Sequence, residues 1–417
     1  MFSSLRIRNY RLYYFSQIIS FTGSFLQTIA YAWLILKLTD SGTMMGLVLS
    51  AQYLPMLIFT PYGGLIADKF SKLKLIYATQ VASALMALLL GLLVLFNAVQ
   101  IWMVFAFAFG LGIIDSMDHP ARNAFLFELV GNDKIKSATG LWTSLMSFTR
   151  IMGPALGGVI IVMFGLGPCF IINALTYIPV FIALSLIRAT ELHIDHAAEK
   201  TKQQIKEGVK YVISTPNLLL PMVMMIIVGT ITYEWTVSMP LFAKFTLNGG
   251  AGAYATISVA MGAGMLIGGL FSAIGKNVSQ KSLVYAAMSL GAVVLIASTV
   301  ANLIAAVIAF IFVGIFERTF TTLNMTSVQI NTDSKMRGRL MAFWSMAYVS
   351  STAIGGPAIG WVGQHAGARW SLAVGGVAAI LASFFGLTFT RRLKRAVAFE
   401  AIAEETEISP GEDKKMV

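Results

Sequence analysis

Charged side chains inside long apolar stretches are the residues of this sequence best placed to do chemistry. Arg150, Glu234 and Glu317 each lie within such a stretch. A charge at the bilayer centre costs roughly 2.5–3.5 kcal/mol on insertion scales, so each should face the protein interior. The chemistry open to these groups is ion pairing, proton uptake or control of a bound solute.

Arg150 precedes a run of small and helix-bending residues. Pro154, four residues later, cannot donate to the carbonyl of residue 150, which permits a bend. Gly153 and Gly157 have the spacing that lets another helix approach closely, and Gly158 follows. We expect a hinge with a cation at its base. Arg150 then controls substrate or coupling, or it forms a structural ion pair within the amino-terminal half, and the sequence leaves both open.

The two glutamates are candidate proton carriers. Glu234 has no basic residue within a helical turn. Because a carboxylate shielded from water favours its neutral form, Glu234 is the first candidate, against the alternative of a hydrogen-bonded structural acid. Glu317 is the second. Its neighbour Arg318 cannot lie on the same side of a helix, so the two need separate partners.

Two aspartates close another apolar stretch. Asp115 and Asp118 lie three residues apart and can share one helix face. They can pair with Arg122 or with the lysines of segment 69–74. Metal binding is a weaker alternative, because one histidine and two aspartates lack an ordered ligand pattern. We therefore expect no metal.

The segment 63–74, GGLIADKFSKLK, joins two apolar stretches and is repeated in faded form. It combines a glycine pair with Asp68 and the lysines Lys69, Lys72 and Lys74. A copy, GGLFSAIGK, follows about 205 residues later, and GPALGG at 153–158 returns as GPAIGW about 203 residues later. The stretches GIIDS at 112–116 and GIFER at 314–318 also match. Repeats at nearly one offset predict two similar halves.

The first apolar stretch carries a polar stripe, with steps of three and four residues that place it on one helix face. Its members are Gln17, Ser20, Ser24, Gln27 and Tyr31. Such a face would be costly against lipid, so we expect it to line a wet cavity. The alternative is polar contact between helices.

The composition indicates a membrane protein with many spanning helices. Of the 417 residues, 57% are hydrophobic and only 12% are charged, whereas ordinary globular chains carry about 25% charge. A spanning helix needs about 20 mostly apolar residues. We predict an all-α polytopic protein of twelve transmembrane helices in two pseudo-symmetric six-helix halves, near 13–37, 44–66, 74–96, 100–119, 138–164, 167–188, 217–242, 252–274, 282–300, 303–324, 340–363 and 369–390.

Charge placement predicts orientation and organisation. Lysine and arginine gather in alternate loops, which places both termini in the cytoplasm of an inner or plasma membrane. We expect an amino-terminal half at 1–188, a cytoplasmic linker at 189–216 with a short amphipathic helix, a carboxy-terminal half at 217–392 and a tail at 393–417. The polar, acidic residues 397–417 are expected to be disordered.

Several function classes are excluded by what the sequence contains. Its basic residues, net charge +11, sit between apolar runs, so membrane topology explains them better than nucleic acid does. Because there is no GxxxxGK[ST] loop, ATP hydrolysis is not expected. The single cysteine excludes an intramolecular disulfide. We expect no enzyme and no cofactor. A non-transporting scaffold or sensor is disfavoured, since it has no need of costly intramembrane charges.

Segment 63–74 resembles the loop motif of the major facilitator superfamily, G-x-x-x-D-R-x-G-R-R. Matching positions are Gly64, Asp68, Lys69, Lys72 and Lys74. Ser71 stands where the second glycine usually lies. GPALGG resembles the antiporter motif of exporters. RNYRLYYFSQ at 8–17, AWLILKLTDSGTMMGLV at 32–48, HPARNAFLFELV at 119–130 and RIMGPALGG at 150–158 resemble the bacterial exporter branch with the enterobactin exporter and macrolide efflux proteins.

The resemblance implies a function and a mechanism. It implies a secondary transporter that exports a small amphipathic compound in exchange for protons, in a bilayer and as a monomer. It also implies that Asp68 holds a cytoplasmic gate shut against the start of helix 11 and the basic residues of its own loop, whereas the alternative is a solvated loop acid. We expect Asp118 and Arg122 to complete this gate. Helices 1, 4, 7 and 10 would line the cavity. Rival functions are a lipid or lysophospholipid flippase, a dedicated transporter of one metabolite, and a uniporter or importer.

Overall fold

The computed structural model describes residues 2–193, 202–274, 279–333, 336–349 and 351–408, and these fold almost entirely into helices. Ten helical stretches of the described chain are long and apolar enough to cross a membrane. One of them, Ile101–Phe164, holds two of the predicted spans. The pair Arg337–Val349 and Thr352–His365 forms another. The prediction of an all-helical protein with twelve spans in two halves is confirmed.

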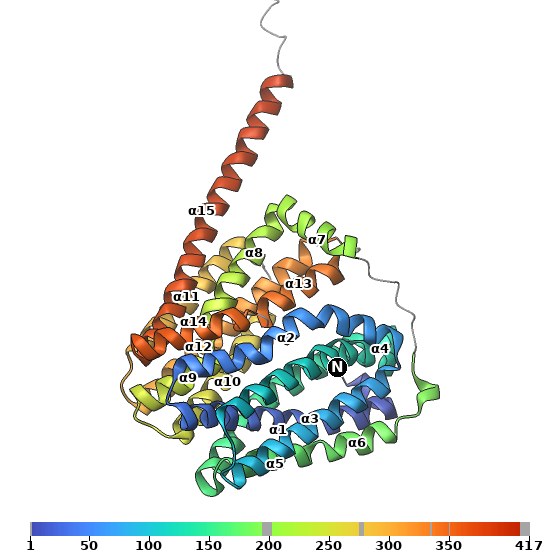
Figure 1. Cartoon of the computed structure of the whole chain (residues 1–417). Helices are drawn as coiled ribbons and strands as arrows, with labels where there is room; N and C mark the ends of the chain where they lie inside the picture. The colour runs from blue at the N-terminus through green and yellow to red at the C-terminus, as the bar shows by residue number, and fades with distance from the viewer. Residues whose placement is uncertain (1, 194–201, 275–278, 334–335, 350, 409–417) are drawn as a thin grey trace, which may run out of the picture.

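The amino-terminal half consists of six spans with short connections (Figure 1). After the short helix η1 (Ser3–Arg6), its helices are α1 (Arg8–Thr39), α2 (Gly42–Lys69), α3 (Lys72–Leu95), α4 (Ile101–Phe164), α5 (Gly167–Thr176) and α6 (Ile178–Ser185). Asp40 ends α1 in the left-handed conformation.

Helix α4 differs from the sequence-based prediction. We expected two spans separated by a connection at 120–137, but that connection is itself helical. The one residue with non-helical dihedral angles is Gly131, at φ 65° and ψ −179°. Only glycine adopts this conformation without strain. The chain therefore turns from one span into the next at Gly131.

The carboxy-terminal half begins after η2 (Ala189–Glu191) and the linker helix α7 (Lys202–Ser214). Its helices are α8 (Pro216–Ile227), η3 (Val228–Thr232), α9 (Trp235–Leu241), η4 (Phe242–Thr246), α10 (Ala251–Ile274), α11 (Gln280–Thr299), α12 (Leu303–Ile330), α13 (Arg337–Val349), α14 (Thr352–His365) and α15 (Ala368–Ile408). The amphipathic linker helix is present. Gly208 and Val212 are buried against the bundle while Lys210 is exposed.

The seventh predicted span is interrupted. It consists of α8, the π-helix η3, α9 and the π-helix η4, with Glu234 at the junction between η3 and α9. Pro240 lies inside α9 and provides no backbone donor. Wide π turns of this kind are frequent at functional sites.

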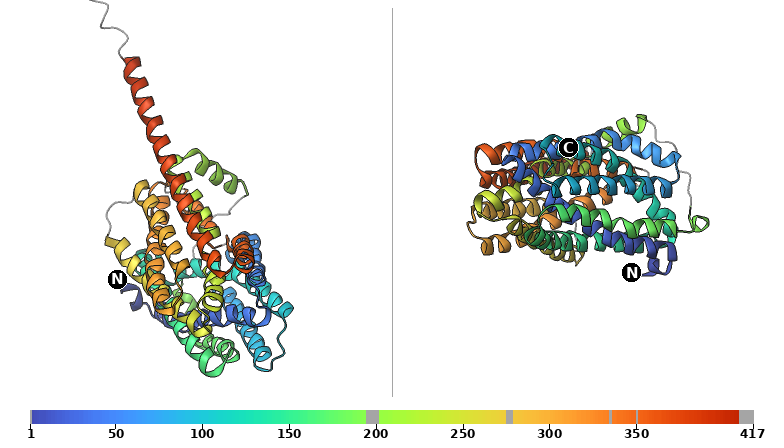
Figure 2. Two further views of the ribbon diagram at one scale, coloured as in Figure 1. Left: turned by 90° about the vertical axis from the view of Figure 1, so that its left-hand side faces the viewer. Right: turned by 60° about the horizontal axis from the view of Figure 1, so that its bottom comes forward.

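Helix α15 runs well past the predicted end of the last span. It continues to Ile408, and its carboxy-terminal part projects beyond the other helices (Figures 1 and 2). The expectation of a disordered tail is therefore wrong for 397–408, while 409–417 lie outside the described residues. The helix continues because residues 393–408 are rich in alanine and glutamate, which favour helix, and contain no glycine or proline.

The two halves touch mainly near one end of the bundle. Helix α2 packs on α14, and the last part of α4 packs on α10, whereas α13 packs on α8 and α12 of its own half and on the linker helix α7. The hydrophobic core follows the same division. One cluster includes Leu34, Met45 and Phe242 from both halves, while a second, with Tyr10 and Phe125, stays within the amino-terminal half. We name the joined end the Asp40 end, and the opposite end the Lys72 end.

Candidate functional site

Glycines form the tightest contact between the halves. Gly42 and Gly46 of α2 face Gly360 and Gly356 of α14. A Cβ added at Gly42 would lie 2.6 Å from the carbonyl oxygen of Gly360, and one added at Gly46 would overlap the carbonyl oxygen of Gly356. Each pair has the spacing of four residues that permits close helix approach. The repeat GPAIGW at 356–361 thus supplies half of an inter-half crossing.

Polar contacts close the same end. The side-chain oxygen of Gln364 on α14 accepts hydrogen bonds from the Ser41 hydroxyl at 2.6 Å and from the Thr43 backbone N–H at 3.1 Å. Lys244 of η4 forms an ion pair with Asp40. These groups seal the Asp40 end by linking α1 and α2 to η4 and α14.

Glu234 lies directly beneath this crossing. Its side chain is buried, with 1% exposure, and neither carboxylate oxygen accepts a hydrogen bond of good geometry within the described structure. A Cβ added at Gly355 would lie 2.6 Å from Glu234 Oε1, and one at Gly356 would lie 3.7 Å from Oε2. The carboxylate therefore rests on bare helix backbone, with the Thr352 side chain nearby. A proton or a change of packing can relieve such an unpaired acid.

Arg150 lies between the halves and has no carboxylate within 4 Å among the described side chains. Its Nη1 is 3.4 Å from the Met265 sulfur of α10, and its guanidinium carbon is 5.7 Å from the centre of the Phe25 ring of α1. Tyr348 of α13 and Glu317 of α12 are its main electrostatic partners. Its surroundings are thus drawn from both halves and include no ion pair within the amino-terminal half.

Glu317 and Arg318 point to different surroundings, as their adjacency requires. Glu317 is buried, with 2% exposure, and its Oε2 has no hydrogen-bond partner within the described structure. Its backbone carbonyl accepts from the Tyr233 hydroxyl at 3.3 Å. Arg318 lies against Gly269 of α10, inside the carboxy-terminal half. Glu317 faces the centre of the molecule and Arg318 a neighbouring helix.

Asp118 and Arg122 form a buried ion pair within the amino-terminal half. Both lie on α4, four residues apart. Arg122 also donates to the side-chain oxygen of Gln17 on α1, and Asp118 accepts from Thr79 at 2.6 Å and Gln80 at 3.2 Å on α3. This network joins three helices. Asp115, one turn away, lies near Gln52 and His119 instead.

The loop segment is only partly described. The side chains of Gly64, Asp68 and Lys69 lie outside the described part of the structure. Lys72 forms an ion pair with Glu128 at 3.2 Å, with both side chains largely buried. Lys74 is exposed. The ion-pair partner of Lys72, Glu128, therefore belongs to the same half as Lys72.

The polar stripe of α1 divides between two roles. Gln17 and Ser20 are buried inside the amino-terminal half, and Ser24 donates to the Ser20 carbonyl at 3.1 Å. Gln27 and Tyr31 line a cavity of about 100 Å³. Its wall also includes Gln52, Tyr53 and Thr236, so both halves contribute. Tyr53 interacts electrostatically with Arg150, Asp115 and Glu234, which places the cavity beside the charged groups.

The glycines of the segment GPALGG at 153–158, in the second span of α4, allow neighbouring helices to pack closely. Gly153 and Gly157 lie against Phe25 and Leu26 of α1, and Gly158 lies against Ala255 of α10. Dihedral angles stay helical through Pro154. The predicted hinge is thus a regular helix here, with small residues that bring α1 and α10 close to Arg150.

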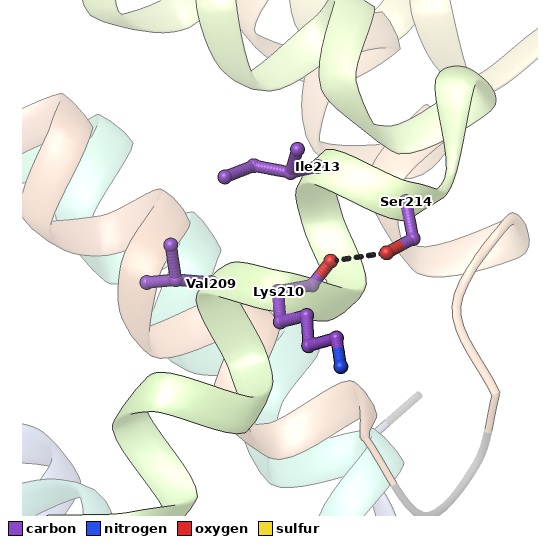
Figure 3. A pocket seen from close by; sticks show the side chains of 4 residues that line it. All are labelled: Val209, Lys210, Ile213 and Ser214. Carbon is purple, nitrogen blue, oxygen red and sulfur yellow. Dashed lines mark hydrogen bonds between the residues drawn. The ribbon is translucent and has the colours of Figure 1, made fainter.

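A further hollow lies along α7, away from these charges. It is lined by Val209, Lys210, Ile213 and Ser214, and the Ser214 hydroxyl donates to the Lys210 carbonyl at 2.7 Å (Figure 3). Figure 3 shows Lys210 directed away from the side on which Val209 and Ile213 lie. One helix face without converging polar groups is a poor solute site.

Sequence reasoning missed several residues of the central site. Trp344 and Tyr348 stack with ring centres 5.4 Å apart, and Tyr233 packs edge-on to Tyr348 at 5.9 Å. The Trp344 indole donates to Asn324 at 2.8 Å. The spacing of four between Trp344 and Tyr348 was a signal, but aromatic pairs also fill ordinary cores. Among the described residues, no group of three or more histidine, cysteine or acidic side chains could hold a metal.

A bundle of twelve spans in two halves, with charges gathered where the halves meet, defines a membrane transporter of the major facilitator type. A family model described as transmembrane secretion effector matches residues 1–410. The chain therefore belongs to this family of multi-pass cell-membrane transporters.

Relatives and solved structures agree with this assignment. The chain is 22% identical to the staphyloferrin A transporter of Staphylococcus aureus, over 81% of this chain and 85% of that protein. It is 23% identical to macrolide efflux protein A of Streptococcus pyogenes, over 68% and 71% respectively. A bacterial homologue of the human lysosomal transporter Spinster, solved in an inward-facing and unoccupied conformation, shares the fold with TM-score 0.71 and 14% identity over 92% of this chain and 97% of that one.

Proposed function

We propose that this protein exports a small amphipathic compound across the inner membrane in exchange for protons, by alternating access between its two halves. The observation that supports this most strongly is the convergence of Arg150, Glu234 and Glu317 where the halves meet. A site between two rigid halves is reached from either side when one half rocks against the other. The names of the relatives, a staphyloferrin A transporter and a macrolide efflux protein, support a small amphipathic cargo.

Glu234 is the proton site in this proposal. The Glu234 carboxylate has no cation partner among the described residues and only the Thr352 side chain beside it, and such a buried carboxylate is costly when charged and cheap when neutral. The acid lies against Gly355 and Gly356, next to the crossing that seals the Asp40 end. Proton uptake therefore favours the sealed state and proton loss favours its opening. This couples the proton to the conformational change.

Both termini face the cytoplasm in this proposal, so the Asp40 end faces outward and the Lys72 end inward. The protein acts as a monomer within the bilayer. The segment at Gly64, Asp68 and Lys69 forms the cytoplasmic gate when the cavity faces outward. Asp68→Asn should then reduce transport strongly while membrane insertion stays normal. Full transport by this variant would remove the gate from the proposal.

Dye accumulation in an efflux-deficient bacterial host tests the function. Cells expressing the protein should accumulate less dye than empty-vector cells, and a protonophore should abolish the difference. Unchanged accumulation in cells with well-folded protein would reject export of a broad range of amphipathic compounds, and would favour one native metabolite or a lipid as the cargo.

Reconstituted protein tests the proton site. Glu234→Gln carries a permanently neutral side chain of the same shape, so it should lose transport driven by a pH gradient and keep exchange of dye across the membrane without a gradient. Glu191→Gln is the matched control, because Glu191 is exposed and pairs with Arg188 at 3.0 Å. Gradient-driven transport by Glu234→Gln at the wild-type rate would exclude Glu234 as the proton carrier.

A further inference from the structure

Arg150 is an intramembrane cation whose contacts leave most of its hydrogen-bonding capacity unused. A guanidinium has five N–H donors. Arg150 contacts a thioether sulfur at 3.4 Å, which is a weak acceptor, the face of the Phe25 ring, and the Tyr348 side chain as a hydrogen-bond partner. By contrast, Arg122 is held by Asp118 and by the side-chain oxygen of Gln17. Arg122 thus has a carboxylate and an amide oxygen as acceptors, whereas Arg150 has no carboxylate within 4 Å among the described side chains.

Arg150 is less deeply buried as a residue than Glu317, the acid that faces it. Arg150 is half-buried, as are Phe25, Tyr53 and Tyr348 around it. Glu317 is 2% exposed and lies behind Tyr233, which hydrogen-bonds to its backbone carbonyl. A solute that reaches the space between the halves therefore meets the cation first, next to aromatic rings.

An aromatic platform lies beside Arg150, in which the half-buried Tyr348 interacts with Arg150 and the buried Trp344 supports Tyr348 from behind. Tyr348 stacks on Trp344 with an angle of 5° between the ring planes, and Tyr233 meets Tyr348 edge-on. Trp235 lies next to Tyr233, with ring centres 6.4 Å apart. Flat apolar groups bind well to such surfaces, while the planar guanidinium binds a carboxylate through two parallel hydrogen bonds.

We propose that Arg150 binds the carboxylate of an organic anion whose apolar or aromatic body lies on the Tyr348–Trp344 platform. This inference rests on the proposed transport function and specifies the class of its cargo. Because Arg150 contacts Phe25 of one half and Met265 of the other, the bound anion neutralises a charge at the junction between the halves. When no anion is bound, the charge of Arg150 interacts with Glu317 instead. Cargo and Glu317 therefore compete for one cation, which favours movement of the halves when cargo is bound.

Binding of a matched probe pair tests the proposal. Purified full-length protein in lipid nanodiscs is titrated at pH 7.4 with 1-naphthoate and with the neutral isostere 1-naphthamide, with empty nanodiscs subtracted. A charge-assisted hydrogen bond contributes about 1.5–3 kcal/mol, so naphthoate should bind about 10- to 150-fold more tightly than naphthamide. Arg150→Gln should bind both probes alike. Arg150→Lys should keep an intermediate preference, because lysine retains the charge and loses the planar fork.

A second variant separates a binding role from a structural one. Glu317→Gln removes the competing acid, so it should tighten naphthoate several-fold and leave naphthamide unchanged. Arg369→Gln removes a remote arginine, whose Nη1 donates to the Thr299 carbonyl at 3.3 Å, and should keep the wild-type preference. The proposal is overturned if naphthoate binds wild type no more tightly than Arg150→Gln, or if Glu317→Gln weakens naphthoate. Proton-driven dye export that persists alongside either result would leave the transport function standing and reject only the anion site.

Discussion

The two ends of the bundle are held together by different kinds of contact. At the Asp40 end the halves meet backbone to backbone, through Gly42 and Gly46 against Gly360 and Gly356. At the Lys72 end the described ion pairs stay within the amino-terminal half, as Lys72 with Glu128 and Asp118 with Arg122. The hydrogen bond from the Tyr211 hydroxyl to Asp333, at 2.9 Å, likewise stays within the carboxy-terminal side.

This difference has a physical consequence for movement between the halves. Separating two uncharged glycine surfaces exposes backbone that is already hydrogen-bonded within its own helix, so it leaves no buried charge unpaired. Separating a buried ion pair would cost several kcal/mol. Charges paired inside one half stay paired when that half moves as a body. The structure therefore places its strong contacts within each half and its separable contacts between them.

Substitution of Gly46 should have the largest effect on closure of the Asp40 end and on transport. Gly46→Leu puts a side chain where the carbonyl of Gly356 lies, and overpacking costs about 1–3 kcal/mol, which shifts the conformational equilibrium roughly 5- to 150-fold. We expect the Asp40 end to stay apart and transport to be lost. Cysteines at Ser41 and Gln364, in a chain with Cys169→Ala, measure closure, because those two side chains are hydrogen-bonded at 2.6 Å.

The control for this substitution is Gly140→Leu. Gly140 lies on α4, and a Cβ there would meet nothing within 4 Å. We expect disulfide formation between the two cysteines at the wild-type rate in Gly140→Leu and a much slower rate in Gly46→Leu. Equal rates in the two variants would show that the glycine crossing does not hold the Asp40 end closed.

The second prediction concerns the buried network of the amino-terminal half. Asp118→Asn removes the charge that balances Arg122, and loss of one partner of a buried pair destabilises by about 3–5 kcal/mol. The melting temperature in detergent should fall clearly. The double variant Asp118→Asn with Arg122→Gln should recover most of that loss, since no unpaired charge remains. A double variant as unstable as the single one would place the stability in hydrogen bonds from Thr79 and Gln80.

The sequence predicted the spanning helices and showed which charges lie within them, but it did not predict the partners of those charges. Apolar length specifies a spanning helix, and a charge within it is visible without a structure. The partner of Lys72 is Glu128, 56 residues away, and no local pattern specifies that pairing. The same holds for Gln17, which the stripe assigned to the cavity and the structure buries against Arg122.

The broken seventh span was also beyond local sequence patterns. Proline and glycine mark places where a helix can change, but they do not say whether it continues, bends or widens into π turns. The sequence showed that Glu234 has no basic residue within a helical turn. Its contact with Gly355 could not be predicted, because that contact depends on how α9 and α14 pack together. The spacing of four residues between Gly42 and Gly46 indicates that another helix can approach closely at this point. It does not identify that helix, which the structure shows to be α14 with Gly356 and Gly360.

A third prediction concerns the ion pair at the Lys72 end. Glu128→Gln leaves Lys72, which is largely buried, without its partner, so unfolding should become easier by about 1–3 kcal/mol. The exchange of both residues, Lys72→Glu with Glu128→Lys, should restore part of the stability. If Glu128→Gln also changed cysteine cross-linking at the Asp40 end, the pair would act between the halves and the contrast between the two ends would fail.

The smallest effect should come from the ion pair of Lys244 with Asp40. The Asp40 side chain is 71% exposed, and exposed ion pairs contribute about 0.2–1 kcal/mol to stability. Asp40→Asn, which removes the charge and still tolerates the left-handed conformation of this residue, should therefore loosen the Asp40 end by less than about sixfold in the cross-linking assay. The change should fade as salt is raised, because screening already weakens the wild-type pair. A loss as large as that of Gly46→Leu would mean that charge, and not the glycine crossing, holds this end closed.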